Sequence, residues 1–304
     1  MSKPILVGYD PITADPTPVN FAVAAARFTG APLTVLSVTA RAEAAAAELD
    51  QDLCGDASGA LALLEPELEA AGIAVECREL PGRTAASALH EAAETQAAGL
   101  VVVGSTRRGT VGRILPGSTA DRLLHGAPCP VAVVPHDWVT RGELQTIGVA
   151  YVDTNEGREA LRGAHALARR AGATLRAITV MKVSPWWHSE TEAGTAVSLP
   201  KTMADVEGEH RVQAEAALRR QVAELGTDVA IEAEVFIGEP AEALTTVSGN
   251  LDLLVMGSRG YGPLKAVLLG GVSRQVAAQA HCPVIVLPRG VRAPLEELLS
   301  AGPA

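Results

Sequence analysis

The chain has 304 residues, is 48% hydrophobic and carries a formal net charge of −10, so it is long enough for two ordinary domains with sizeable cores. A chain with this excess of acidic residues lacks the basic surface that nucleic-acid binding requires. No apolar run approaches the roughly eighteen residues of a membrane-spanning helix. The N-terminal MSKPILVGYD also lacks the apolar core of a signal peptide, so we expect a cytoplasmic protein with no nucleic-acid or membrane partner.

Strand-like and helix-like segments alternate along the first half. Strands are predicted over residues 5–10, 33–39, 74–80, 99–105 and 131–135, and Ala-rich helices over residues 19–30 and 84–96. The run LVVV at 100–103 does not alternate with polar residues. Continuous apolar strands are buried on both faces, which favours a parallel sheet covered by helices.

The second half repeats this alternation. Strands are predicted over residues 147–153, 174–181, 229–236, 251–258 and 284–288, and helices over residues 156–172 and 206–226. In the last helix, Val212, Ala216, Val222 and Leu225 predict one apolar face. Strand–helix alternation with right-handed crossovers predicts an α/β protein of two tandem doubly wound, Rossmann-like domains, each with a mainly parallel five-stranded sheet.

An internal repeat supports this division. Residues 104–135 align without a gap on residues 257–288, an offset of 153, and ILVGYD at 5–10 resembles GVAYVD at 148–153, an offset of 143. We expect an insertion around SPWWHSETEAGTAVSLPKTM to absorb the difference, with Trp186 and Trp187 anchoring that loop. The predicted domains are 1–138 and 139–304, joined near HDWVTRGELQT at 136–146.

The last strand of each half, at 131–135 and 284–288, is short, apolar and closed by a proline. As the edge of a sheet, such a strand would leave backbone groups unpaired. We therefore expect the two strands to pair antiparallel within one chain, with further homodimerisation left open. Cys129 and Cys282 precede these strands and are interpreted as small buried residues rather than a redox couple.

The glycine-rich segment GSRGYGPLKAVLLGG, Gly257 to Gly271, follows the apolar run LDLLVM. In open α/β sheets, ligands bind beyond the carboxyl ends of the strands, where Gly257 is expected. Gly260 and Gly262 keep the loop bare of side chains. Gly270 and Gly271 stand at the start of the next helix, whose unpaired N–H groups favour an anion. The segment is neither a Walker A motif nor a dinucleotide fingerprint, so alone it also fits an ordinary strand–loop–helix turn.

The segment resembles the universal stress protein family, whose ATP-binding members carry G-x2-G-x9-G-[ST]. Gly257, Gly260 and Gly270 fit this spacing, and Gly271 stands where the hydroxyl residue is expected. The first half departs differently: Gly104, Gly117 and Ser118 fit, Arg107 occupies the second glycine position, and Gly109 lies two residues later, matching Gly262. Both halves also end in C-P-V-x-V-x-P, so the resemblance covers nearly the whole chain.

The resemblance implies a nucleotide site in each half. An aspartate ending the first strand would contact the nucleoside, a valine late in the second strand would present its backbone to adenine, and the glycines with the following hydroxyl would hold the phosphates. The residues implied are Asp10, Val38, Gly104, Gly117, Ser118 and Thr119 in the first half, and Asp153, Val180, Gly257, Gly260, Gly270, Gly271 and Ser273 in the second. Arg107 either blocks the first-half loop or, with Arg108, adds positive charge beside the phosphates. Asp10 and Asp153 could instead only cap the turn after a strand.

By this resemblance we expect an ATP-binding regulator of the stress response, with Mg²⁺ as an accompanying ion left open. No Ser-His-Asp grouping, metal constellation or carboxylate pair is evident in the sequence, so we do not expect an enzyme. Two alternatives stay open: an interaction module of the same fold that has lost the nucleotide, and a slow ATPase. The tail APLEELLSAGPA at 293–304 predicts a short surface helix or a frayed end.

Overall fold

The computed structural model describes residues 3–40, 66, 68, 72, 74–105, 118–140, 142–182, 203–258, 271–289 and 294–299. The strands of the first half are β1 (Ile5–Tyr9), β2 (Leu33–Ala40), β3 (Val75–Gly82), β4 (Leu100–Gly104) and β5 (Val131–Val134). Those of the second half are β6 (Thr146–Ala150), β7 (Thr174–Met181), β8 (Ile231–Ile237), β9 (Leu253–Gly257) and β10 (Val284–Leu287). Together they form one sheet in the order β3-β2-β1-β4-β5-β10-β9-β6-β7-β8.

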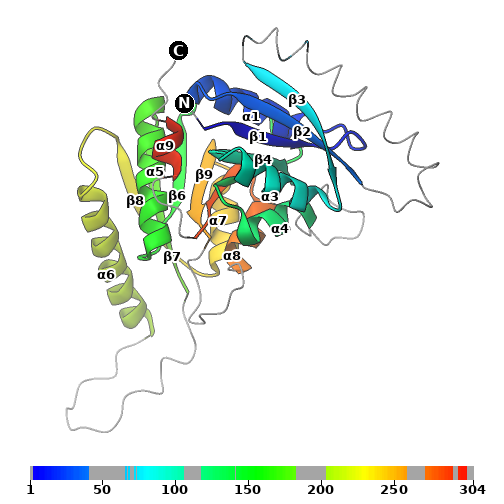
Figure 1. The fold of residues 1–304 in the computed structure, drawn as a ribbon. Helices are drawn as coiled ribbons and strands as arrows, with labels where there is room; N and C mark the ends of the chain where they lie inside the picture. Colours follow the sequence, from blue (N-terminus) through cyan, green and yellow to red (C-terminus); the bar gives the residue numbers. More distant parts are fainter. Residues whose placement is uncertain are drawn as a thin grey trace.

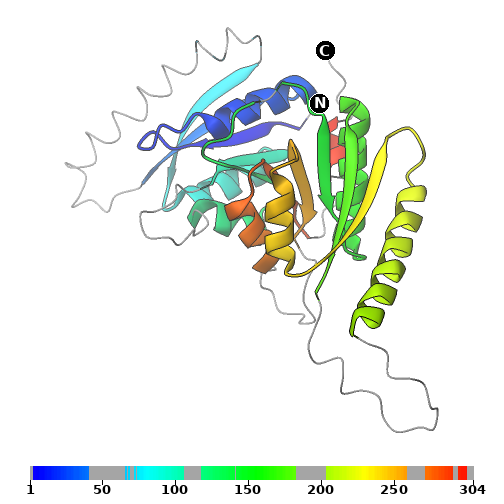
Figure 2. The same cartoon turned by 180° about the vertical axis from the view of Figure 1, so that it is seen from behind.

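Within each half all strand pairs are parallel, as the uninterrupted apolar runs predict. The tandem doubly wound fold is therefore confirmed. The halves lie side by side in both views (Figures 1 and 2). The ten strands form one continuous sheet across the two halves. The division at residues 138 and 139 stays a prediction.

The halves join through the one antiparallel pair of the sheet, β5 with β10. Ala132 faces Ile285 at its centre, and these two residues occupy equivalent positions of the repeat. An approximate twofold axis therefore passes between them. On one side of it, Arg274 of the second half makes a 2.7 Å ion pair with Asp121 of the first, again at equivalent positions. The predicted antiparallel pairing within one chain is confirmed.

Helices cover both faces of the sheet. The helices are α1 (Thr17–Thr29), α3 (Ala85–Thr95), α4 (Ser118–Gly126), α5 (Asn155–Ala171), α6 (Met203–Ala223), α7 (Pro240–Ser248), α8 (Gly271–Gln279) and α9 (Pro294–Leu299). One core lies under α1, α5, α6 and α9 and the other under α3, α4, α7 and α8, and each contains residues of both halves. Cys129 and Cys282 are buried in the second core, as predicted.

Within the predicted tail, residues 294–299 form the short helix α9, which is one of the two alternatives predicted, and its apolar side is docked on the core. Leu295 and Leu298 are buried in the first core. Leu295 packs against Gly163 of α5, and Leu298 against Gly99, at the start of β4 in the other half. The amphipathic spacing of these leucines buries one side of a six-residue helix, which therefore contacts both halves.

Two further predictions concern the second-half insertion and the helix that follows it. Trp186 and Trp187 lie outside the described residues. The apolar face predicted for the following helix is partly wrong: Val212 and Ala216 of α6 are exposed, Val212 at 61%, while Leu218, outside the predicted set, is buried. Val222 and Leu225 do pack against the core.

Candidate functional site

A cavity of about 460 Å³ opens at the carboxyl ends of the first-half strands. The lining residues come from the carboxyl-terminal parts of β1, β2 and β4, the loop after β1, the starts of α1, α3 and α4, and the segment after β5. Four of the predicted site residues line it: Asp10, Val38, Gly104 and Thr119. Ser118 begins α4 beside them. Arg107, Gly109 and Gly117 lie outside the described residues.

The loop between β1 and α1 forms one wall of the cavity and is held by its own side chains. Asp10 is exposed, and its carboxylate accepts hydrogen bonds from the Ile12 N–H at 3.0 Å and the Thr13 hydroxyl at 3.2 Å. This is the turn-capping role that the sequence left open for Asp10. The same carboxylate lines the cavity, so capping and ligand contact are compatible: a carboxylate accepts through about four lone pairs.

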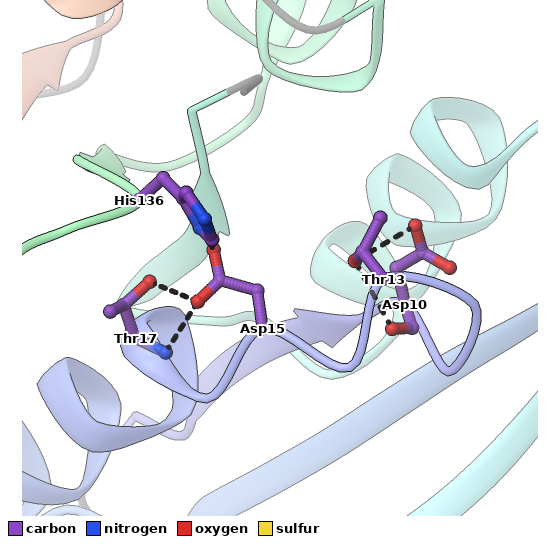
Figure 3. Close-up of polar contacts among 5 residues, drawn as sticks. All are labelled: Asp10, Thr13, Asp15, Thr17 and His136. Atoms are coloured by element: carbon purple, nitrogen blue, oxygen red, sulfur yellow. Dashed lines mark hydrogen bonds and ion pairs between the residues drawn. The ribbon is translucent and has the colours of Figure 1, made fainter. Parts of the chain in front are cut away.

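A second carboxylate, Asp15, lies at the other end of this loop (Figure 3). Its Oδ1 accepts hydrogen bonds from the Thr17 N–H at 3.0 Å and the Thr17 hydroxyl at 2.6 Å, which caps the start of α1. Its Oδ2 lies 2.6 Å from Nδ1 of His136, just after β5. Burial raises the pKa of the Asp15 carboxyl, but the hydrogen bonds from Thr17 and the contact with His136 outweigh it and hold that pKa below its usual range.

Gly104 ends β4 and lines the cavity. A Cβ atom at this position would lie 3.1 Å from Cγ of Pro18 and 3.9 Å from Oδ2 of Asp15. A larger residue would therefore press on the start of α1 and fill the cavity from this side. Thr119 stands in the first turn of α4, where backbone N–H groups lack helical acceptors and favour an anion. The described lining thus combines an anion-ready helix start with two carboxylates and one imidazole.

The second half does not reproduce this arrangement. By strand register, Ile147 corresponds to Ile5 and Leu175 to Leu33, a shift of 142 residues. Tyr151 then matches Tyr9, and Asp153 lies one position beyond the equivalent of Asp10. The predicted offset of 143 is therefore wrong by one residue, because the sequence alignment matched two carboxylates while the sheet matches two tyrosines.

Asp153 is already engaged in this half. Arg158 of α5 donates to its Oδ1 at 2.5 Å, and the Tyr151 hydroxyl donates to the same atom at 3.2 Å. Burial, and then the neighbouring Asp153 charge, raise the pKa of Tyr151 to about 12, so its hydroxyl stays protonated as the donor. The turn-capping alternative left open for Asp153 does not describe it, because its carboxylate accepts from the side chains of Arg158 and Tyr151.

Gly257 also has a different neighbour from Gly104. The helix after the first strand begins at Asn155, with Thr154 as its cap, so the connecting loop is shorter than in the first half. Its first turn lies directly on Gly257: a Cβ there would be 2.9 Å from Cβ of Glu156 and 3.1 Å from its carbonyl oxygen. The first turn of α5 therefore covers the end of β9.

The remaining second-half residues are placed as follows. Val180 lies next to the last residue of β7 and is buried. Gly271 opens α8 and is exposed, whereas the buried Ser273 hydroxyl donates to the Gly257 carbonyl at 3.2 Å, which turns it towards the strand. Gly260 and Gly270 lie outside the described residues.

Comparison with known proteins identifies the family of this chain. A family model described as the universal stress protein family matches residues 1–135 and 143–288. The chain belongs to the universal stress protein family. The two matched segments cover both halves, so it is a tandem universal stress protein.

Full-length relatives share this tandem organisation. A universal stress protein of Mycobacterium tuberculosis is 27% identical over 301 residues, covering 93% of this chain and 99% of the relative. Another from the same organism is 34% identical over 190 residues, covering 62% of this chain and 61% of the relative. A crystal structure of a universal stress protein from Archaeoglobus fulgidus has a TM-score of 0.68 at 22% identity, covering 95% of this chain and 97% of that one. This last similarity shows the fold alone.

Sequence reasoning missed two residues of the first-half site in this universal stress protein, Asp15 and His136. A signal for Asp15 was present, because Asp before Pro-Thr-Pro is a typical helix start. For His136 the repeat itself held the signal: the residue after the final proline is basic in both halves, His136 and Arg289. None of the helices described above is long and apolar enough to cross a membrane.

Proposed function

We propose that this universal stress protein binds ATP or a related adenine nucleotide in its first half and acts as a cytoplasmic regulator of the stress response, not as an enzyme. The observation that carries the proposal is the cavity of about 460 Å³ that brings Asp10, Val38, Gly104 and Thr119 together. These four residues come from four different segments of the first half; Asp10, Val38 and Gly104 match the family's nucleotide pattern, and Thr119 adds a hydroxyl at the start of α4.

The chemistry of the lining fits the parts of a nucleotide. The exposed Asp10 carboxylate can accept hydrogen bonds from ribose hydroxyls. Leu36, Val38 and Leu89 supply apolar surface of the kind that a purine ring packs against. The bare backbone at Gly104 and the start of α4 suit phosphate oxygens. No group of His, Cys, Asp and Glu able to hold a metal occurs in the described part of the chain. If Mg²⁺ takes part, it would bind to the phosphates of the nucleotide.

We assign the site to the first half although the glycine spacing is complete only in the second. Two contacts support this choice. The Arg158 guanidinium forms an ion pair with the Asp153 carboxylate, and the backbone of Glu156 occupies the space beside Gly257. The Glu156 backbone would have to move before a nucleotide could approach Gly257. Asp153 would have to share its carboxylate with Arg158 and Tyr151.

Calorimetric titration with ATP tests the proposal, using matched variants of the two halves. Asp10→Asn keeps the turn-capping oxygen but removes the charge that would hold the ribose. We expect it to weaken ATP binding by roughly tenfold or more, since hydrogen bonds to charged groups contribute about 1.5–3 kcal/mol. Asp153→Asn should leave the affinity unchanged. Absence of ATP binding in the wild type, and of nucleotide in the denatured purified protein, would favour the nucleotide-free module. Steady phosphate release abolished by Asp10→Asn would favour the slow ATPase.

A further inference from the structure

The two halves repeat one ion pair that the glycine pattern does not include. In each half a basic residue follows the proline after the last strand: His136 after β5 and Arg289 after β10. His136 lies 2.6 Å from Asp15, just before α1, and Arg289 lies 3.9 Å from Glu156, in the first turn of α5. Each pair therefore joins the end of the last strand to the start of the first helix.

Each acid of these pairs also lies against the glycine that ends the fourth strand. Asp15 Oδ2 is 3.9 Å from the Cβ position of Gly104, and Glu156 is in direct contact with Gly257. The cation of the second half is a guanidinium, which is charged at every physiological pH. The cation of the first half is an imidazole, which gains and loses its proton between about pH 5 and 8. One position of the repeat thus carries a permanent charge in one half and a titratable charge in the other.

The charges around His136 give this difference a consequence. The loop after β1 presents Asp15 and, farther along, the exposed Asp10, and β1 contributes the Tyr9 hydroxyl, whose pKa is raised mainly by burial. The neighbouring ends of β4 and α4 contribute the uncharged Ser105 and Thr119 to the lining. Among the described lining residues, His136 is therefore the one that can be positively charged, and its imidazole contacts the Asp15 carboxylate.

We propose that His136 is a positioning residue of the first-half site that admits the anionic part of the ligand only when its imidazole is protonated. The protonated ring neutralises Asp15 beside Gly104, where the phosphates of a nucleotide would lie. With a neutral ring, the ionised Asp15 faces those phosphates and repels them. Ligand binding and proton binding at His136 are therefore linked, and each strengthens the other. This inference rests on the proposed nucleotide site.

The test is a set of titrations of the full chain with ATP between pH 5.5 and 8.5. The proteins are the wild type, His136→Gln, His136→Arg and, as a control histidine outside the cavity, His281→Gln. Adenosine, which lacks the phosphates, serves as the uncharged probe. ATP itself gains a proton in this pH range, but that contribution is the same for every variant, so the differences between variants are the measurement.

For the wild type and His281→Gln, we expect ATP affinity to fall by about tenfold from pH 6 to pH 8, because losing a positively charged partner of the phosphates costs about that much. His136→Arg, which copies the second half, should bind as the wild type does at pH 6 and hold that affinity at pH 8. His136→Gln should bind weakly throughout, and adenosine should show no difference between variants.

Two other outcomes separate the inference from the proposal beneath it. If ATP binds and Asp10→Asn weakens it, but the wild type and His136→Gln share one pH profile, the role of His136 is refuted and the site stands. If ATP does not bind the wild type at any pH, the nucleotide site and the inference fail together. Circular dichroism of His136→Arg and His136→Gln at each pH distinguishes lost binding from lost fold.

Discussion

The docking of α9 across the two halves leads to a quantitative prediction for Leu298→Ala. Leu298 is 3% exposed, and its Cδ1 would lie 2.8 Å from a Cβ at Gly99 in the other half. Removing a buried leucine side chain costs about 2–5 kcal/mol, through lost burial and the cavity left behind. The loss of stability caused by Leu298→Ala cannot exceed the free energy with which α9 docks, because a six-residue helix can detach while the sheet stays folded.

The expected shift in melting temperature follows from the size of the chain. Unfolding entropy is about 2.1 cal/mol/K per residue, or roughly 0.6 kcal/mol/K for a chain of this length, so Leu298→Ala should lower Tm by about 3–8 °C. Differential scanning calorimetry measures the shift, and Val139→Ala, at a side chain that is 74% exposed, serves as the matched control. Equal melting temperatures for Leu298→Ala and the control would refute the docking of α9 between the halves.

Further predictions concern ionisable groups and the pairing of the halves. Burial, then the charge of Glu159, raises the pKa of Glu296 in α9, so its contribution to stability is complete below its usual pKa and is lost as pH rises through the raised value. Glu296→Gln should therefore raise Tm at pH 7 and change it little at pH 4; a lower Tm at pH 7 would contradict this. The pKa of Asp15 is held low, so the stability it contributes is present above its usual pKa and is lost as pH falls through the lowered value; Asp15→Asn should lower Tm at pH 7 more than at pH 3. Asp121→Arg should destabilise the chain by about 1 kcal/mol in urea unfolding, because Arg274 would then face a like charge, and the double exchange Asp121→Arg with Arg274→Asp should restore most of that loss. Additive effects of the two exchanges would show that the pair does not couple the halves.

Most of the fold could be predicted from the sequence because continuous apolar runs mark the buried strands. LVVV and LLVM predict buried parallel strands, and β4 and β9 are found there. The gapless repeat over 104–135 and 257–288 places the last strands at equivalent positions, which predicted their antiparallel pairing. The face of α6 was harder, because a helix at the outer end of the sheet buries little: Leu218 is 1% exposed while Val212 remains in solvent.

The site was predictable in its residue types but not in its choice of half. The glycine spacing favours the second half, yet the geometry depends on where the first helix begins. Pro16 and Pro18 delay α1 to Thr17, while Thr154 caps α5 three residues after Tyr151. That difference places the first turn of α5 over Gly257 and leaves the cavity open beside Gly104. These residues at the helix starts are visible in the sequence, but their effect on a glycine far along the chain required the folded sheet.

The number of ATP molecules bound per chain tests the central claim most directly. Native mass spectrometry of the full chain with excess ATP at pH 6 should show one bound nucleotide, which Asp10→Asn diminishes and Asp153→Asn leaves in place. Two nucleotides per chain, or one that is lost in Asp153→Asn and kept in Asp10→Asn, would contradict a site formed by the first half.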